Sequence, residues 1–284
     1  LIILTFKICV QFQIISHAGG NFSNQKKMEN FTLVKELHIT KRSKVYEAVD
    51  QNSNKVLIKT IPKSTDKYYY KIHPSTLKLV PKEMYFLEQL SLYDYVPKVL
   101  EYFEDESSST FVTEFLDGDW SDLFFYTEKC NKEAKLKVIF KNIITTMYKM
   151  AEKGYYHLDI KPENIMINQR SLKIKFIDLE DMIFNRQENP HISIYAGTIG
   201  FRSPESYSKE LYDLKQSLVY SVGCTLYSCI ELNDPIRTFE NVKSQPLQMF
   251  SSSKYAAAFI QFCTKFVPEK RMKFEKLTDH IWFK

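Results

Sequence analysis

The chain has 284 residues, of which 44% are hydrophobic and 14% aromatic, a composition that can bury a sizeable core and excludes a disordered chain. Its formal net charge is only +5, so nucleic acid is not an expected partner. Five scattered cysteines form no metal-ligand pattern and favour a reduced, intracellular protein.

The first 27 residues are predicted to lie outside the folded domain. They contain no acidic residue, and their apolar stretch is shorter than the ~20 residues that a membrane-spanning helix needs, so no membrane span is expected. Three origins stay open: a fragment or upstream sequence ahead of a start at Met28, an ordered extension, or a secretory signal within residues 1–18. The expected location is the cytoplasm or the nucleus, or the exterior if that signal is genuine.

The next part of the chain is predicted to be rich in strands. Three strands are expected at residues 31–37, 43–50 and 55–61, with a turn at 50–54 that joins the last two as a hairpin. A helix is expected from about Pro81, and two more extended segments follow it before residue 116. We therefore expect a small β-rich lobe over about residues 29–115 that contains one main helix.

From Trp120 onward the pattern becomes helical. Residues 135–154 carry an apolar stripe at helical spacing, and Gly154 fits the position just after a helix end. Residues 216–232 are apolar on nearly all sides, which predicts a buried helix, and a last helix is expected over 255–267. The predicted fold class is α+β with two lobes, the second covering about residues 116–284. A cleft between two lobes is a common place for a ligand.

Polar residues recur at close spacing in HLDIKPEN, residues 157–164. Asp159 could orient a hydroxyl proton, Lys161 could neutralise a phosphoryl oxygen, and Asn164 offers an uncharged oxygen to Mg²⁺. Asp178, at the end of an apolar strand, adds a carboxylate suited to the same ion.

These motifs resemble those of the eukaryotic protein kinase family, whose catalytic loop is H-R-D-x-K-x-x-N and whose metal motif is D-F-G. Here the metal motif is DLE, beginning at Asp178. The resemblance extends from about Phe31 to Phe283. It implies a domain over residues 28–284 with the two-lobed kinase fold, ATP and Mg²⁺ or Mn²⁺ as cofactors, and proteins as substrates.

The resemblance also assigns residues to the site. Lys59 in VLIK would hold the ATP phosphates, and Glu83 would pair with it, with Glu88 the weaker candidate. The implied catalytic residues are Asp159, Lys161, Lys59 and Glu83, and the implied metal ligands are Asn164 and Asp178. The implied nucleotide-binding residues are His38, Thr40, Ser43, Val45, Lys59, Thr113, Glu114 and Leu116. GTIGFRSPE (197–205) resembles the end of an activation segment, whose Glu205 would pair with Arg271.

Serine/threonine specificity is implied by Lys161 and by Thr198, whose hydroxyl would contact both Asp159 and Lys161. The expected function is transfer of the ATP γ-phosphate to serine or threonine hydroxyls, by a protein that is a monomer by default. The alternative is a pseudokinase that binds or scaffolds partners, with weak or no phosphotransfer. A phosphotransferase acting on a small molecule is the remaining reading.

The strongest departure from the family is the phosphate-covering loop, which should be G-x-G-x-x-G-x-V. Aligned on Val45, it has His38, Thr40 and Ser43 in place of the three glycines. Glycine lets backbone N–H groups approach a phosphate closely, so weak ATP binding is expected. Lys41, Arg42 or Lys44 could compensate by charge, or could simply be exposed hairpin residues.

Other departures concern metal binding and regulation. Glu180 and Asp181 follow Asp178 and could recruit extra metal or merely add negative charge. Leu158 replaces the arginine that pairs with a phosphorylated activation segment, so activity is expected to be constitutive or driven by a partner, unless Arg186 or Arg202 substitutes. Leu218 replaces an aspartate that holds the catalytic loop, which bears on stability.

Overall fold

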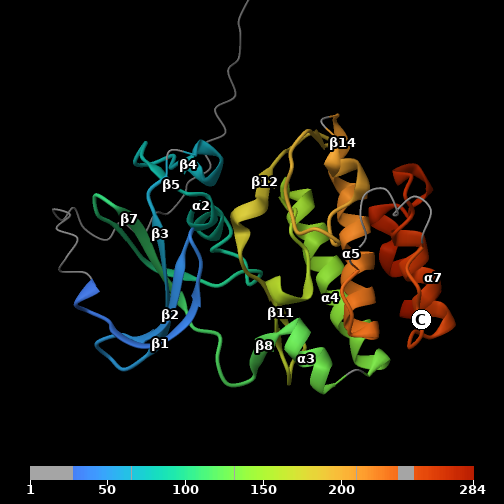
Figure 1. Ribbon diagram of the computed structural model, residues 1–284, viewed down its shortest axis with the longest axis horizontal. Helices are drawn as coiled ribbons and strands as arrows, with labels where there is room; N and C mark the ends of the chain where they lie inside the picture. Colours follow the sequence, from blue (N-terminus) through green and yellow to red (C-terminus); the bar gives the residue numbers. More distant parts are fainter. Residues whose placement is uncertain (1–27, 65, 131, 209, 236–245) are drawn as a thin grey trace, which may run out of the picture.

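The computed structural model describes residues 28–64, 66–130, 132–208, 210–235 and 246–284. The predicted extension, residues 1–27, lies outside the described residues. The described chain forms two lobes, a sheet with one main helix on the left of Figure 1 and a larger helical lobe on the right. The predicted α+β class with two lobes is confirmed.

The small lobe is built on an antiparallel sheet of five strands in the order β1-β2-β3-β7-β6. The strands are β1 (Thr32–Ile39), β2 (Lys44–Val49), β3 (Lys55–Pro62), β6 (Val99–Glu104) and β7 (Ser108–Glu114). The predicted hairpin turn at 50–54 forms because the Asp50 carboxylate accepts the N–H groups of Asn52 and Asn54, both at 2.8 Å.

The main helix of this lobe is α2 (Lys82–Gln89), with Pro81 as its N-cap, which agrees with the start predicted at about Pro81. Met84 and Leu87 are buried in a core cluster that also contains most of the large lobe's apolar residues, so α2 is anchored to both lobes. The sequence did not predict the short segments before it, which are η1 (Lys67–Tyr69), β4 (Tyr70–Ile72) and β5 (Leu79–Pro81). Segments of three residues are too short to show a periodic pattern.

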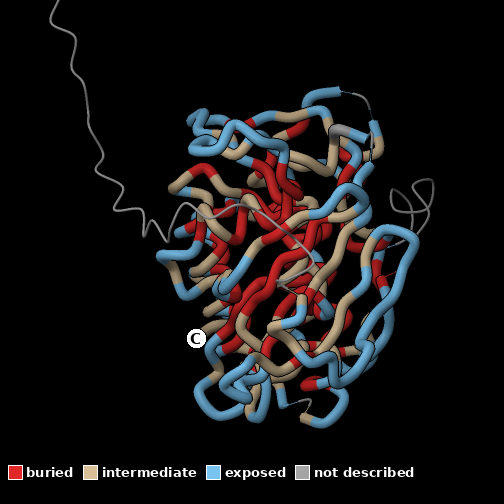
Figure 2. The backbone as a smooth tube through the Cα atoms, turned by 90° about the vertical axis from the view of Figure 1, so that its left-hand side faces the viewer, coloured by how far each residue is buried: buried red, intermediate tan, exposed pale blue. Residues whose placement is uncertain are grey.

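The large lobe is built around two long helices, α4 (Glu133–Glu152) and α5 (Leu214–Glu231), both predicted. Figure 2 shows the buried backbone running through the middle of the molecule. Gly154 ends the α4 turn with φ of +86°, and a Cβ there would lie 2.9 Å from the Asn185 carbonyl oxygen. The backbone of residue 154 therefore requires glycine.

Shorter elements complete the large lobe. The helices are α3 (Leu123–Lys129) and α7 (Lys254–Cys263), and 3₁₀ turns follow to the end of the chain. The strands are β8 (Trp120–Asp122), β9 (Tyr155–His157), β10 (Ile165–Asn168), β11 (Ile174–Phe176), β12 (Met182–Phe184), β13 (His191–Ile192) and β14 (Tyr212–Asp213). Over the described ranges, no helix is both long and apolar enough to cross a membrane.

Candidate active site

A cavity of about 590 Å³ lies between the two lobes. Its walls come from β1, β2, β3, α2, β7 and the loop that contains HLDIKPEN. The apolar lining includes Val45, Leu57, Met166 and Ile177, and the polar lining includes Lys59, Glu83, Thr113, Lys161, Asn164 and Asp178. Most of the predicted site residues therefore face one cavity.

Lys59 is the first polar anchor of the cavity. It lies on β3, and its Nζ is 2.5 Å from a carboxylate oxygen of Glu83 and 3.5 Å from one of Asp178. Burial opposes the Lys59 charge, but the carboxylates of Glu83 and Asp178 outweigh it and hold the pKa above its ordinary value. Glu88 instead pairs with His73 at 2.7 Å, so Glu83 is the acid that meets Lys59.

Asp159 does not line this cavity but a small neighbouring one, which shares Lys161 and Asp178 with it, and its side chain is held from three sides. Its carboxylate accepts the Thr198 N–H at 2.7 Å and the Asn164 side-chain amide at 2.9 Å, and lies 3.0 Å from Lys161 Nζ. Burial would raise the pKa of Asp159, but the Lys161 charge and the hydrogen bond from Thr198 lower it below its ordinary value. The Asp159 carboxyl is therefore held in its ionised form at neutral pH.

Thr198 joins the two charged residues of the loop. Its hydroxyl accepts a hydrogen bond from Lys161 Nζ at 2.7 Å, while its backbone N–H, and not its hydroxyl, binds Asp159. The expected contact of Thr198 with both residues is present, but two different groups of Thr198 make it.

The oxygens of Asn164 and Asp178 fit a magnesium ion. Asp178 has a left-handed backbone (φ of 55°), and its buried Oδ1 accepts no hydrogen bond among the described residues, although Lys59 Nζ lies 3.5 Å from it. Asn164 uses its amide nitrogen on Asp159, which leaves its carbonyl oxygen for a ligand. Among the described residues, no group of three or more His, Cys, Asp or Glu could hold a metal ion.

The hinge between the lobes lines the cavity with Thr113, Glu114 and Leu116. The Glu114 carboxylate accepts hydrogen bonds from the Lys98 N–H at 2.9 Å and from Lys175 Nζ at 2.7 Å. The Glu114 N–H donates to the Lys98 carbonyl at 3.0 Å, so a ligand cannot use that donor.

The loop without glycine contributes only part of its predicted set. His38 and Val45 line the cavity, whereas Thr40 does not, and Ser43 lines a neighbouring cavity. The Thr40 hydroxyl oxygen accepts the N–H groups of Arg42 at 3.1 Å and Ser43 at 3.0 Å. These donors are therefore spent within the turn and are not offered to a phosphate.

Arg42 is the loop cation that reaches the catalytic residues. It lines a small cavity together with Asp159, Lys161 and Thr198, and its guanidinium is 3.7 Å from the Glu180 carboxylate. The sequence left Lys41, Arg42 and Lys44 open because three neighbouring cations carry no signal that distinguishes them.

The two extra acids of the metal motif line the same small cavity but have different partners. Glu180 is half-buried and faces Arg42, and burial together with the Asp178 charge raises its pKa. Asp181 accepts hydrogen bonds from the Gly197 N–H and the Tyr68 hydroxyl. No sequence pattern predicted this role for Asp181.

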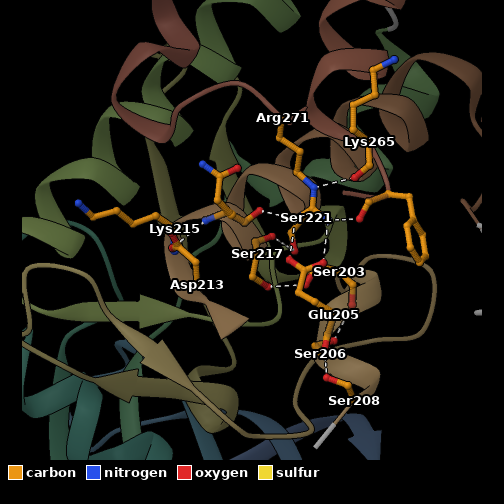
Figure 3. Close-up of polar contacts among 12 residues, drawn as sticks. Ser203, Glu205, Ser206, Ser208, Asp213, Lys215, Ser217, Ser221, Lys265 and Arg271 are labelled. Atoms are coloured by element: carbon orange, nitrogen blue, oxygen red, sulfur yellow. Dashed lines mark hydrogen bonds and ion pairs between the residues drawn. The ribbon is translucent and has the colours of Figure 1, made fainter. Parts of the chain in front are cut away.

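A second network supports the segment that ends at Glu205 (Figure 3). Arg271 donates to both Glu205 oxygens, at 2.6 and 2.7 Å, and to three backbone carbonyls, so its fully buried guanidinium is saturated with acceptors. The hydroxyls of Ser203 and Ser217 share a hydrogen bond at 2.8 Å. Leu158 and Leu218 both lie in the apolar core. The expected pairing of Glu205 with Arg271 is present.

Comparisons with known proteins point in one direction. A family model described as "Protein kinase domain" matches residues 31–283. Serine/threonine-protein kinase cds1 of Schizosaccharomyces pombe is 25% identical over 289 residues, an alignment that covers 95% of this chain and 62% of the relative. Serine/threonine-protein kinase 1 of African swine fever virus (isolate Pig/Kenya/KEN-50/1950) is 26% identical over 194 residues, covering 66% and 62%.

A third relative, Serine/threonine-protein kinase ppk6 of Schizosaccharomyces pombe, is 26% identical over 261 residues, covering 89% of this chain and 33% of the relative. The chain therefore spans less than two thirds of the length of each of these three relatives.

Proposed function

Because this chain belongs to the protein kinase family, we propose that it is a serine/threonine protein kinase that transfers the γ-phosphate of ATP to hydroxyl groups of proteins. The observation that carries the proposal is the meeting of two neighbouring cavities. The Lys59–Glu83 pair lines the larger one, Asp159 and Thr198 line the smaller one, and Lys161 and Asp178 line both. The use of ATP and a divalent metal ion follows from the family.

The charged and polar residues of the site have the following proposed roles. Lys59, fixed by Glu83, binds the α- and β-phosphates and holds the nucleotide in register. Asp159 orients the substrate hydroxyl and accepts its proton, and Lys161 balances negative charge on the transferred phosphoryl group. Asn164 and Asp178 would hold Mg²⁺, or Mn²⁺, which supplies further positive charge at the phosphates.

Two features support serine and threonine as the acceptors. Lys161 donates to the Thr198 hydroxyl, the pairing expected of the serine/threonine type, and the matched relatives carry "serine/threonine-protein kinase" in their names. Protein substrates, as opposed to small molecules, follow from the same likeness.

One observation favours the second candidate, a pseudokinase that binds partners. In the loop expected to cover the phosphates, two backbone N–H groups donate to the Thr40 hydroxyl instead of to a phosphate, which weakens nucleotide binding. We nevertheless favour an enzyme, because the charged groups proposed for chemistry are assembled and paired.

The test is an assay of purified protein with labelled ATP, Mg²⁺ or Mn²⁺, and a generic acceptor protein. We expect label on serine and threonine by phosphoamino-acid analysis, and none with Asp159→Asn, which keeps the size of the side chain but removes the proton acceptor. Label on tyrosine would overturn the proposed specificity. Equal silence of the wild type and the variant would favour the binding module.

A further inference from the structure

Asp181 connects three parts of the chain that are distant in sequence. Its Oδ2 accepts the Gly197 N–H at 2.8 Å, and its Oδ1 accepts the Tyr68 hydroxyl at 3.0 Å. Its backbone carbonyl accepts the Leu158 N–H at 3.4 Å. One residue therefore contacts the small lobe, the catalytic loop and the 193–205 segment, which is the stretch of chain that ends at Glu205, the partner of Arg271.

Two of these partners are neighbours of residues that contact the reaction centre. Leu158 precedes Asp159, and Gly197 precedes Thr198, whose N–H binds Asp159. Asp181 thus holds both pieces of backbone that set the orientation of the Asp159 carboxylate. Each of its carboxylate oxygens already accepts a hydrogen bond, one from Tyr68 and one from Gly197.

Gly197 has little room to move. Its φ is +86°, and a Cβ at this position would lie 2.5 Å from the Leu158 carbonyl oxygen. The backbone of Gly197 therefore lies against the catalytic loop, so a hydrogen bond to its N–H fixes Thr198 as well.

Tyr68 is held in place as a hydrogen-bond donor. It lies in η1, and the buried Lys82 of α2 has its Nζ 4.1 Å from the centre of the Tyr68 ring. Burial and the Asp181 charge raise the pKa of Tyr68, so its hydroxyl stays protonated and donates to Asp181. The link therefore extends from the start of α2, the helix that carries Glu83, to Thr198.

The catalytic loop has Leu158 beside Asp159, and this side chain is buried and apolar. It offers no charge to a phosphate group on the 193–205 segment. The Asp181 carboxylate instead binds the same segment from inside the fold, through the Gly197 N–H.

We propose that Asp181 is a positioning residue that uses Tyr68 and Gly197 to hold Thr198, and through it Asp159, in the catalytic orientation without phosphorylation of the 193–205 segment. The inference rests on the proposed kinase function. The link positions Asp159, which orients the substrate hydroxyl, and not the residues that bind ATP. Its loss therefore lowers kcat and leaves KM for ATP nearly unchanged.

The test compares Tyr68→Phe with Tyr70→Phe. The first removes only the hydroxyl that binds Asp181, whereas Tyr70 makes its hydrogen bonds within the small lobe, to Ser64 and Pro62. We expect Tyr68→Phe to lower kcat about tenfold, with KM for ATP within about twofold of the wild type. Tyr70→Phe should match the wild type, and Asp181→Asn, which can accept only one of the two bonds, should lose at least as much as Tyr68→Phe.

Two more measurements complete the design. Adding Tyr68→Phe to Asp181→Asn should cost no further kcat, because both changes break the same link. Phosphatase treatment of the wild type should leave kcat unchanged. Wild-type kcat in Tyr68→Phe, fully additive losses in the double variant, or a large loss after phosphatase would overturn the proposal.

Amide hydrogen exchange of residues 194–200 separates this proposal from the proposed function, since it needs no activity. We expect faster exchange in Tyr68→Phe than in Tyr70→Phe. If the wild type transfers no phosphate, the kinase proposal fails, and faster exchange still supports the link from Tyr68 to Gly197. Equal exchange in the two variants overturns the link.

Discussion

At the scale of single residues, Thr40 determines what the loop between β1 and β2 offers a nucleotide. Its hydroxyl accepts two backbone N–H groups that a glycine at this position would leave for a phosphate. The sequence predicted a weakened loop from the missing glycines. It could not predict the cause, which is an added hydroxyl that occupies the donors.

Thr40→Gly should therefore bind ATP more tightly than the wild type, by about fivefold, roughly the worth of one hydrogen bond. Thr40→Ser keeps the hydroxyl and is the matched control, with an expected affinity close to that of the wild type. Calorimetric titration of ATP into the three proteins measures this. A Thr40→Gly variant that binds no better than Thr40→Ser would contradict the role given to the hydroxyl.

Lys82 gives a prediction about pH. Burial lowers its pKa to about 8, against 10.5 for a free lysine. Below pH 8 both the folded and the unfolded chain carry the proton, and the folded chain bears the full cost of the buried charge. Between about pH 8 and 10.5 only the unfolded chain stays protonated, so the contribution of Lys82 to the free energy of unfolding rises with pH.

The free energy of unfolding of the wild type, relative to Lys82→Met, should thus rise by up to ~3 kcal/mol across this window. Urea unfolding at several pH values measures it. Lys98→Met removes an exposed lysine and is the control, for which the difference from the wild type should stay constant. If the difference in free energy of unfolding between the wild type and Lys82→Met stays constant from pH 7 to 10.5, the pKa of Lys82 is not lowered.

At the scale of elements, periodicity carried the prediction. Helices α2 and α4 were predicted because their apolar residues recur at helical spacing, and α5 because its segment is apolar on nearly all sides. Strands β1, β2 and β3 were predicted because each is bounded by polar turn residues. The hairpin of β4 and β5 was not predicted, since each strand has only three residues. Its consequence for the site is large, because η1, just before β4, places Tyr68 on Asp181.

The ion pair between the segment ending at Glu205 and the turn at Arg271 should be a major source of stability. Arg271→Met leaves the Glu205 carboxylate without its partner in a buried place, which should cost ~3–5 kcal/mol. Lys276→Ala, which breaks the exposed pair with Asp279, should change stability by less than ~1 kcal/mol. Thermal unfolding of the two variants and the wild type measures both losses of stability. Similar losses in Arg271→Met and Lys276→Ala would contradict the larger contribution given to the Arg271 pair.

At the scale of the whole molecule, the two lobes and the cavity between them followed from the sequence, whereas the links across the cavity did not. Lys59 and Glu83 belong to known motifs and could be paired in advance. Tyr68 and Asp181 are 113 residues apart and belong to no shared motif, so only the folded structure brings them together. The same holds for Arg42 and Glu180.

The molecule combines an assembled set of proposed catalytic groups with a weak hold on the nucleotide. The rate of phosphate transfer to an acceptor protein, measured against ATP concentration up to the millimolar range, tests this most directly. We predict a rate that saturates only at high ATP, reaches a measurable kcat and disappears in Asp159→Asn. No transfer at millimolar ATP with either Mg²⁺ or Mn²⁺, in the wild type as in Asp159→Asn, would contradict the account.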